Sequence, residues 1–163
     1  KIPGVYDVTM LGFNYRMNEL AAALGIEQLK RIDGFLSKRK RNFDMLTAAL
    51  KTIPAVTILQ SSHDEYESSY YCLSIILDDA HAPKRFEIVK YLNDHGVGTS
   101  VYYPKPEPLM NYYQKKYGFQ EKDFPVASWI SNNSIALPVG PHLEDNDMEY
   151  IGTMVKEAIH NCS

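Results

Sequence analysis

Apolar residues recur at helical spacing in the first third of the chain. Residues 19–30 are predicted to form a helix that is apolar on nearly every side, and Asn18 suits its N-cap because its side-chain oxygen accepts a backbone N–H of the first turn. Such a helix must be covered all round, by its own domain or by a partner. A longer amphipathic helix is predicted over residues 32–50, ending before Pro54, which cannot continue a helix. Gly34 weakens the join between the two helices, so we expect a kink there.

After Pro54 the pattern changes to short runs that are rich in β-branched and aromatic residues. These runs predict strands over residues 56–59, 70–77 and 97–103, and residues 61–68 read as a polar loop. The alternate prolines that begin at position 104 lack backbone N–H groups, so an extended loop must follow the third of these strands.

Helix-like patterns of apolar residues stand between the predicted strands and after the last of them. A helix is predicted from Pro83 to about Asn93, closed by a glycine C-cap at His95-Gly96. Its inward residues are expected to be Phe86, Ile88, Val89 and Leu92. The remaining elements are two short helices, a brief strand and a last helix, near residues 109–117, 125–131, 135–137 and 145–159. This order favours an α+β fold: a small, mostly antiparallel sheet with helices packed on one face, preceded by a long helical segment.

The composition excludes several classes of protein. Of the 163 residues 45% are apolar, which supports a sizeable core, and the net charge of −3 argues against a nucleic-acid-binding domain. No apolar stretch approaches the roughly 18 residues that a membrane span needs. Neither Cys72 nor Cys162 has metal-ligand spacing to a second Cys or a His, so we predict no metal site and two free thiols in a reducing cytoplasm.

Charged residues are concentrated in two places. Lys38-Arg39-Lys40-Arg41 lies on the second predicted helix, whose apolar face is already accounted for, so these side chains are expected mostly to point to water. The acids of Leu143-Glu144-Asp145-Asn146-Asp147 fall at the start of the last helix, where they complement its dipole.

A polar and aromatic loop, Gly12-Phe13-Asn14-Tyr15-Arg16-Met17, stands immediately before the first helix. Arg16 can bind an anion through two parallel hydrogen bonds from its guanidinium, and Asn14 can donate one from its side-chain amide. From the residues alone, an anion site and a structural loop both remain open. The sequence holds no glycine-rich phosphate loop and no self-contained catalytic set.

Three segments in order along the chain resemble one known family. They are residues 6–25 around this loop, then Val101-Tyr102-Tyr103-Pro104, then Asp123-Phe124-Pro125-Val126-Ala127 followed by Ile135-Ala136-Leu137-Pro138. They are similar to the glycine-aromatic-Asn-Tyr-Arg-Met motif, the Val-His-Tyr-Pro segment, and the late Phe-Pro and Ser-Leu-Pro pair of the DegT/StrS family. Its members are pyridoxal-phosphate-dependent nucleotide-sugar aminotransferases.

The resemblance implies a particular part of such an enzyme. Residues 1–163 are expected to be a single domain, the C-terminal small domain of a fold-type I aminotransferase. The large cofactor-binding domain, with the lysine that forms the Schiff base, is expected upstream of Lys1, because no lysine here stands in a matching motif. Amino transfer needs that amine. We therefore expect no catalytic residue in this chain and no activity from it alone.

Four residues receive roles from the resemblance. Asn14 is expected to reach the cofactor phosphate of the neighbouring subunit in a homodimer, and Arg16 to meet anionic substrate groups at the active-site entrance. Tyr102, at the usual His position, is expected to face the cleft and bond a sugar hydroxyl, while Tyr103 packs in the core because neighbouring strand residues point to opposite faces. Lys105 is expected to lean toward a diphosphate. The alternative makes both tyrosines core residues and leaves Lys105 solvated.

The function implied by the resemblance is amino transfer from glutamate to a nucleotide-linked keto sugar in polysaccharide biosynthesis, in the cytoplasm. The alternatives are a non-catalytic regulatory or sensory relative with the same fold and, third, a free-standing interaction module. Three positions depart from the family pattern: Tyr102 and Pro108 replace histidines, and Ser128 replaces a common Glu. The first two changes affect the details of sugar binding and leave the fold assignment untouched.

Overall fold

The computed structural model describes residues 7, 9–63 and 65–162. Residues 6 and 8 of the family-like segment therefore lie outside the described residues. The chain divides into two compact units, residues 1–33 and residues 34–163. Among the described residues, no helix is both long enough and apolar enough to cross a membrane.

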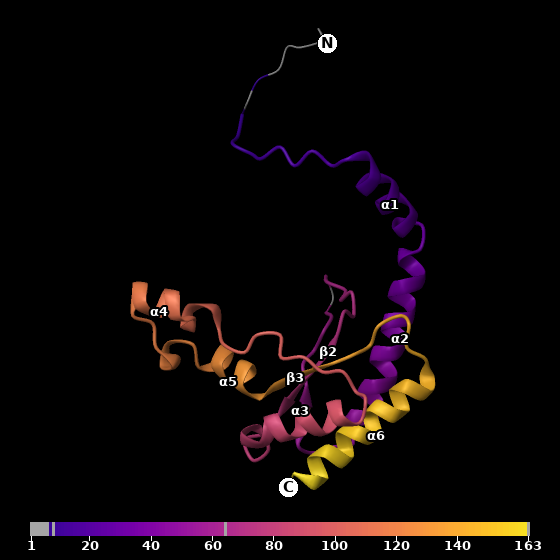
Figure 1. Cartoon of the computed structure of the whole chain (residues 1–163). Coiled ribbons are helices and arrows are strands. Elements are labelled where there is room, and N and C mark those ends of the chain that lie inside the picture. Colours follow the sequence, from indigo (N-terminus) through magenta and orange to yellow (C-terminus); the bar gives the residue numbers. More distant parts are fainter. Residues whose placement is uncertain (1–6, 8, 64, 163) are drawn as a thin grey trace. The chain divides into compact units, whose positions relative to one another are not determined.

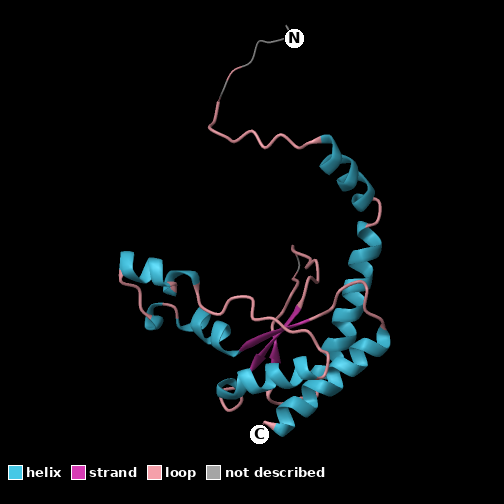
Figure 2. Cartoon of the chain, in the orientation of Figure 1, coloured by secondary structure: helices cyan, strands magenta, loops and turns pink. Residues whose placement is uncertain are grey.

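The described residues form an α+β fold (Figures 1 and 2). In chain order its elements are α1 (Glu19–Leu29), α2 (Ile32–Leu50), β1 (Val56–Ile58), β2 (Leu73–Leu77), α3 (Arg85–Asp94), α4 (Asn111–Tyr117), α5 (Pro125–Asn133), β3 (Ser134–Leu137) and α6 (Asp145–Asn161). Short 3-10 turns precede α3, α4 and α5. The predicted helices are confirmed, whereas only three of the four predicted strands form in the described part of the chain.

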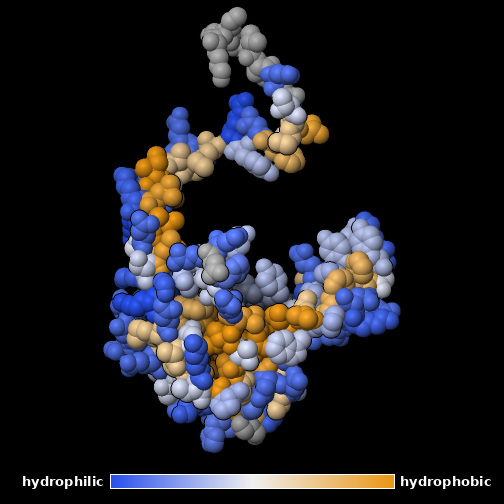
Figure 3. All heavy atoms as spheres, turned by 180° about the vertical axis from the view of Figure 1, so that it is seen from behind, coloured by the Kyte–Doolittle hydropathy of each residue, from blue (hydrophilic) through white to orange (hydrophobic). Residues whose placement is uncertain are grey.

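The first unit is dominated by α1. Asn18 caps this helix as predicted, since its Oδ1 accepts the backbone N–H of Ala21 at 2.8 Å. None of the residues of α1 is buried, and Leu20 is 85% exposed. Figure 3 shows the result as a strip of hydrophobic surface along α1.

The interruption between α1 and α2 falls before the predicted place. The N–H of Arg31 donates to the carbonyl of Gln28 at 3.0 Å, a tighter turn than the α-helical one, and this closes α1 at Lys30. Gly34 lies inside α2. The expectation that Gly34 marks the join was therefore wrong, because hydrogen bonding at the end of α1 already supplies the break.

The second unit is built on a three-stranded antiparallel sheet of order β1-β2-β3. Its register aligns Ile58 with Ile75 and Ile75 with Ile135, so one isoleucine from each strand stands in a row across the sheet. Because strand residues alternate between faces, Leu73 and Leu77 share the face of this row. This face belongs to the hydrophobic core.

Three helices cover that face of the sheet, as predicted. Figure 1 shows α3 and α6 side by side, and α2 supplies further residues to the same core. The helical contribution consists mainly of Phe43, Leu46, Leu50, Ile88, Leu92, Met148, Ile151 and Val155. Helices α2 and α6 approach closely at Gly152, where an added Cβ would lie 2.9 Å from the Cβ of Ala49. A glycine is needed at this crossing.

The strand predicted over residues 97–103 does not form. Only Ser100 bridges to β3, through two backbone hydrogen bonds with Ala136. The neighbouring N–H groups serve the end of α3 instead: that of Val97 donates to the carbonyl of Leu92, and that of Thr99 to the side chain of Asn93. A continuous ladder needs those donors, so the prediction of a strand was wrong.

Two smaller expectations also failed. Strand β2 begins at Leu73 rather than at position 70, because Tyr70 adopts a left-handed φ of 49°, which a strand cannot accommodate. Phe86 was expected to face inward but is 78% exposed. The buried residues of α3 are Ile88 and Leu92, one turn apart, and a residue two positions before Ile88 lies on the opposite side of the helix.

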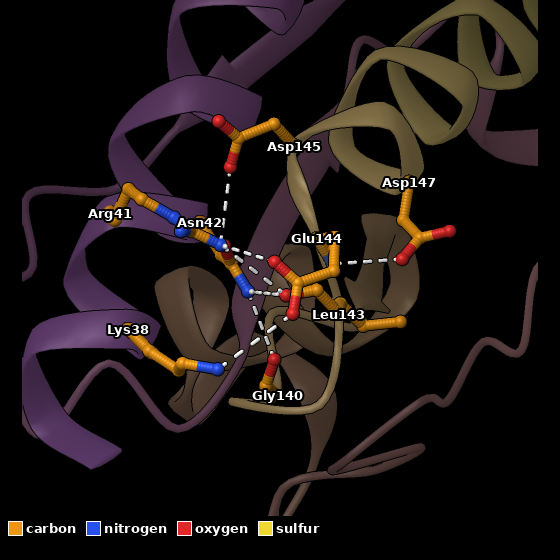
Figure 4. Close-up of polar contacts among 8 residues, drawn as sticks. All are labelled: Lys38, Arg41, Asn42, Gly140, Leu143, Glu144, Asp145 and Asp147. Atoms are coloured by element: carbon orange, nitrogen blue, oxygen red, sulfur yellow. Dashed lines mark hydrogen bonds and ion pairs between the residues drawn. The ribbon is translucent and has the colours of Figure 1, made fainter. Parts of the chain in front are cut away.

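A fully buried amide ties α2 to the loop between β3 and α6 (Figure 4). Asn42 donates from Nδ2 to the carbonyl oxygens of Gly140 and Leu143, at 2.9 and 3.1 Å. Its Oδ1 accepts from the guanidinium of Arg41, with Nη2 at 3.1 Å. Both donors and the acceptor of the amide are thus used. The loop over residues 138–143 is thereby fixed against α2.

Charges around this amide strengthen the same contact. Arg41 lies 3.1 Å from Asp145 and 3.5 Å from Glu144, at the start of α6. Asp147 accepts the backbone N–H of Glu144 at 2.8 Å, which completes a capping box for α6. The predicted acids at this helix start are confirmed, and they also pair with cations of α2.

We predict that Asn42→Ala lowers the free energy of unfolding by about 2–4 kcal/mol, because two hydrogen bonds are lost and the carbonyl of Gly140 is left without its donor. Denaturant unfolding measures this change. The matched control is Asn132→Ala, which removes an exposed amide bonded to Glu121, and its expected cost is below about 0.5 kcal/mol. Equal losses for both variants would contradict the proposed role of Asn42.

Candidate functional site

The loop before α1 presents two candidate anion donors. Asn14 Oδ1 accepts the backbone N–H of Arg16 at 3.2 Å, which turns the amide nitrogen away from that contact. Within the described residues, the structure records no partner for this nitrogen or for the guanidinium of Arg16. Phe13 and Tyr15 stand exposed, with ring centroids 5.7 Å apart. The loop thus offers both donors on a backbone that is partly fixed by its own hydrogen bond.

A hollow of about 400 Å³ lies in the second unit. Its side-chain lining includes Arg39, Tyr71, Cys72, Tyr102 and His142. Residues 98–100 and 136–141 complete the lining. The 138–143 loop, which Asn42 fixes, therefore forms one wall, and the segment that carries Ser100 forms another.

Two phenols meet in this hollow. The rings of Tyr71 and Tyr102 are arranged edge to face, with centroids 5.9 Å apart. Hydrogen bonding with Tyr71, together with partial burial, raises the pKa of Tyr102 to about 12. At neutral pH Tyr102 is therefore a neutral hydroxyl that can donate a hydrogen bond, whereas an imidazole at the same place would titrate.

Arg39 was missed as a site residue by the sequence analysis, which treated the whole charged run as solvated. Its side chain is half-buried, and its guanidinium carbon lies 5.8 Å from the ring centroid of Tyr71. A signal was available, because positions 35, 39 and 43 are spaced by four and lie on one side of a helix. Phe43 on that side is buried. Lys38 and Lys40 are exposed as expected.

The other predicted residues are distributed between two places in the second unit. Tyr102 is 43% exposed and lines the hollow of about 400 Å³, and Tyr103 is 66% exposed, so neither is a core residue. The expected alternation was wrong because these residues are not in a strand. Lys105 lines a separate hollow of about 180 Å³ together with Ser128, whose hydroxyl is buried without a hydrogen-bond partner. The structure therefore places Tyr102 and Arg39 in the lining of one hollow, and Lys105 and Ser128 in the lining of another.

Comparisons with known proteins agree with this fold. A model of the DegT/DnrJ/EryC1/StrS aminotransferase family matches residues 3–156. The spore coat polysaccharide biosynthesis protein SpsC of Bacillus subtilis is 31% identical over 156 residues, covering 94% of this chain and 40% of SpsC. GDP-perosamine synthase of Escherichia coli O157:H7 is 29% identical over 149 residues, covering 91% of this chain and 38% of that protein.

A solved structure is similar over nearly the whole chain. The putative sugar aminotransferase Spr1654 from Streptococcus pneumoniae, in its PMP form, aligns with a TM-score of 0.82 at 27% identity, covering 98% of this chain and 39% of that one. The fold is that of an α+β portion of a fold-type I aminotransferase. The chain belongs to the DegT/DnrJ/EryC1/StrS aminotransferase family, which confirms the resemblance of its motifs. It spans about 40% of the length of these relatives.

The raised pKa of Tyr102 predicts a pH-dependent stability. An unfolded tyrosine ionises near its ordinary pKa of 10.0, whereas folded Tyr102 keeps its proton to about 12. Its stabilising contribution is present below pH 10 and is lost as the pH rises toward 12, because the folded state then binds more protons than the unfolded state. Denaturant unfolding at pH 9, 10 and 11 should show a shallower decline in Tyr102→Phe. The control Tyr66→Phe, outside the hollow, should follow wild type; a Tyr102→Phe curve parallel to wild type would contradict the assignment.

Proposed function

We propose that this chain is the C-terminal part of a sugar aminotransferase that transfers an amino group from glutamate to a nucleotide-linked keto sugar, with pyridoxal phosphate as cofactor. The observation that carries the proposal is the loop before α1, which presents the amide of Asn14 and the guanidinium of Arg16 in the order of the family motif. Both groups are donors suited to phosphate and carboxylate oxygens.

The names of the relatives support the substrate class. One is a GDP-perosamine synthase, whose name includes a nucleotide-linked sugar, and another is a putative sugar aminotransferase solved in PMP and PLP forms. The glutamate donor and the place in polysaccharide biosynthesis remain part of the proposal, the latter supported by the name of SpsC.

The residues of this chain fit a supporting role toward the cofactor. When bound, pyridoxal phosphate supplies the electron sink for amino transfer. Asn14 donates to its phosphate from the neighbouring subunit of a homodimer, and Arg16 pairs with an anionic group of the substrate. Tyr102 donates its hydroxyl hydrogen to a sugar hydroxyl, whereas Lys105 lines a separate hollow. The Schiff-base lysine belongs to a cofactor-binding domain outside residues 1–163.

The exposed surface of α1 supports the homodimer. A helix that leaves Leu20, Leu24 and Leu29 largely exposed carries more apolar surface than a stable monomer normally leaves in water. In the proposed assembly the rest of the polypeptide and the second subunit cover this helix, which meets the expectation drawn from its all-round apolar pattern.

The function is tested by comparing the full-length protein with the chain of residues 1–163 alone. Given pyridoxal phosphate, glutamate and a nucleotide-linked keto sugar, the full-length protein should release 2-oxoglutarate and form the amino sugar. The chain alone should do neither, and borohydride reduction after incubation with the cofactor should leave no stoichiometric adduct at one lysine. A full-length protein that binds no cofactor and releases no 2-oxoglutarate would favour the regulatory alternative. A single stoichiometric adduct on the chain alone would contradict the missing lysine.

The loop residues have separable expected effects in the full-length protein. Asn14→Ala should weaken cofactor retention, and Arg16→Ala should mainly raise the KM of the anionic substrate. Each loses a charge-assisted hydrogen bond worth about 1.5–3 kcal/mol, or roughly one to two orders of magnitude in binding. Arg16→Lys keeps the positive charge but loses the bidentate geometry, so its KM should lie between those of wild type and Arg16→Ala. Melting temperatures of the apo forms should barely move; apo forms that unfold while surviving protein keeps normal kinetics would indicate a structural loop.

A further inference from the structure

Arg39 differs from the other cations of the run Lys38–Arg41. Each of its three charged neighbours pairs with a carboxylate at 2.7 to 3.7 Å. For Arg39, the structure records no carboxylate partner among the described residues. Arg39 lines instead the hollow that Tyr102 also lines. Among the hollows recorded in the described part of the chain, Arg39 is the only residue of this run that lines one.

The guanidinium of Arg39 is also incompletely hydrogen-bonded. Its Nε is buried and has no hydrogen-bond partner. An anion that enters the hollow can accept hydrogen bonds from the terminal nitrogens of this half-buried side chain. The contact with the ring of Tyr71 supplies part of the missing interaction through the π face but no acceptor in the plane of the guanidinium.

The surroundings of Arg39 have the properties of a binding site. The hollow of about 400 Å³ falls within the range of small-molecule sites and exceeds what a single anion fills. Arg39 stands one helical turn before Asn42, whose hydrogen bonds fix both α2 and the opposite loop. The hydroxyl of Tyr102, in the same lining, adds a neutral donor.

We propose that Arg39 binds the diphosphate of the nucleotide-linked sugar in this hollow, with the hydroxyl of Tyr102 donating to the adjoining sugar. The inference rests on the proposed function and adds a substrate-binding residue to it. It assigns the diphosphate to Arg39, which lines the same hollow as Tyr102, and not to Lys105, which lines the separate hollow.

The lining of the hollow selects a diphosphate over the amino-acid substrate. Glutamate brings an ammonium group as well as carboxylates, and that group needs an acceptor of opposite charge. The residues that line the hollow include no Asp or Glu. Bound there, the ammonium would stand unpaired near the guanidinium of Arg39. The diphosphate and the keto sugar attached to it bring anionic, hydroxyl and carbonyl groups but no ammonium, and the guanidinium and the phenols can match these groups.

The test measures binding of inorganic pyrophosphate to the full-length protein loaded with its cofactor, so that the cofactor phosphate site is already filled. Calorimetry should show about 10–100-fold weaker binding for Arg39→Met, the loss expected when one strong charge-assisted contact is removed. Arg39→Lys should fall between. The matched control Lys38→Met removes the same charge one residue away, at an exposed side chain, and should change binding less than about threefold. Equal effects of the two methionine variants, or none for either, would overturn the proposal.

A second measurement needs no variant. Phenylglyoxal modifies accessible arginines, and peptide mass spectrometry reports the extent at Arg39. Pyrophosphate should slow modification of Arg39 in the wild-type protein, and glutamate should not. Protection by glutamate alone would overturn the assignment to a diphosphate. Equally slow modification with and without either compound would also overturn it, since a carboxylate of the polypeptide would then occupy the guanidinium. Protection by pyrophosphate in a protein that shows no amino transfer would retain this site and reject the proposed function.

Discussion

The buried amide of Asn42 is the contact on which the second unit depends. One side chain holds the loop between β3 and α6 against α2, and every polar atom of that side chain is used. Burying such a group is favourable only when all its hydrogen bonds are made, so the amide specifies one arrangement of the helix and the loop. The ion pairs of Arg41 with the start of α6 act at the surface of the same contact, where each pair contributes little by itself.

The elements that the sequence predicted well are those with a local cause. Asn18 caps α1, Gly96 closes α3 with a positive φ of 77°, and the apolar spacing of α2 places Leu46 and Leu50 in the core. The failures have distant causes. Residues 97–103 have strand-like composition, but their N–H groups bond to the end of α3, and sequence pattern alone does not show which acceptor a donor will reach.

The residues of the candidate site also differ in whether a local sequence pattern or a distant contact distinguishes them. The motifs predict roles for Asn14, Arg16 and Tyr102, because each stands at a fixed place in a recognisable segment, and these roles stay predictions. Arg39 was concealed by its neighbours, since a run of four cations is typical of a solvated helix face. What distinguishes it is burial beside Tyr71, a contact between α2 and a segment more than thirty residues away, which depends on how the helix packs against the sheet.

The close crossing of α2 and α6 at Gly152 has a mechanical consequence for the hollow. With no layer of side chains between Gly152 and Ala49, the two helices and the loop that Asn42 fixes are expected to move as one stiff body. The facing wall is attached to the sheet at Ser100 through one isolated bridge. A bulkier occupant of the hollow is therefore expected to displace the segment that carries Tyr102 more readily than the helix that carries Arg39.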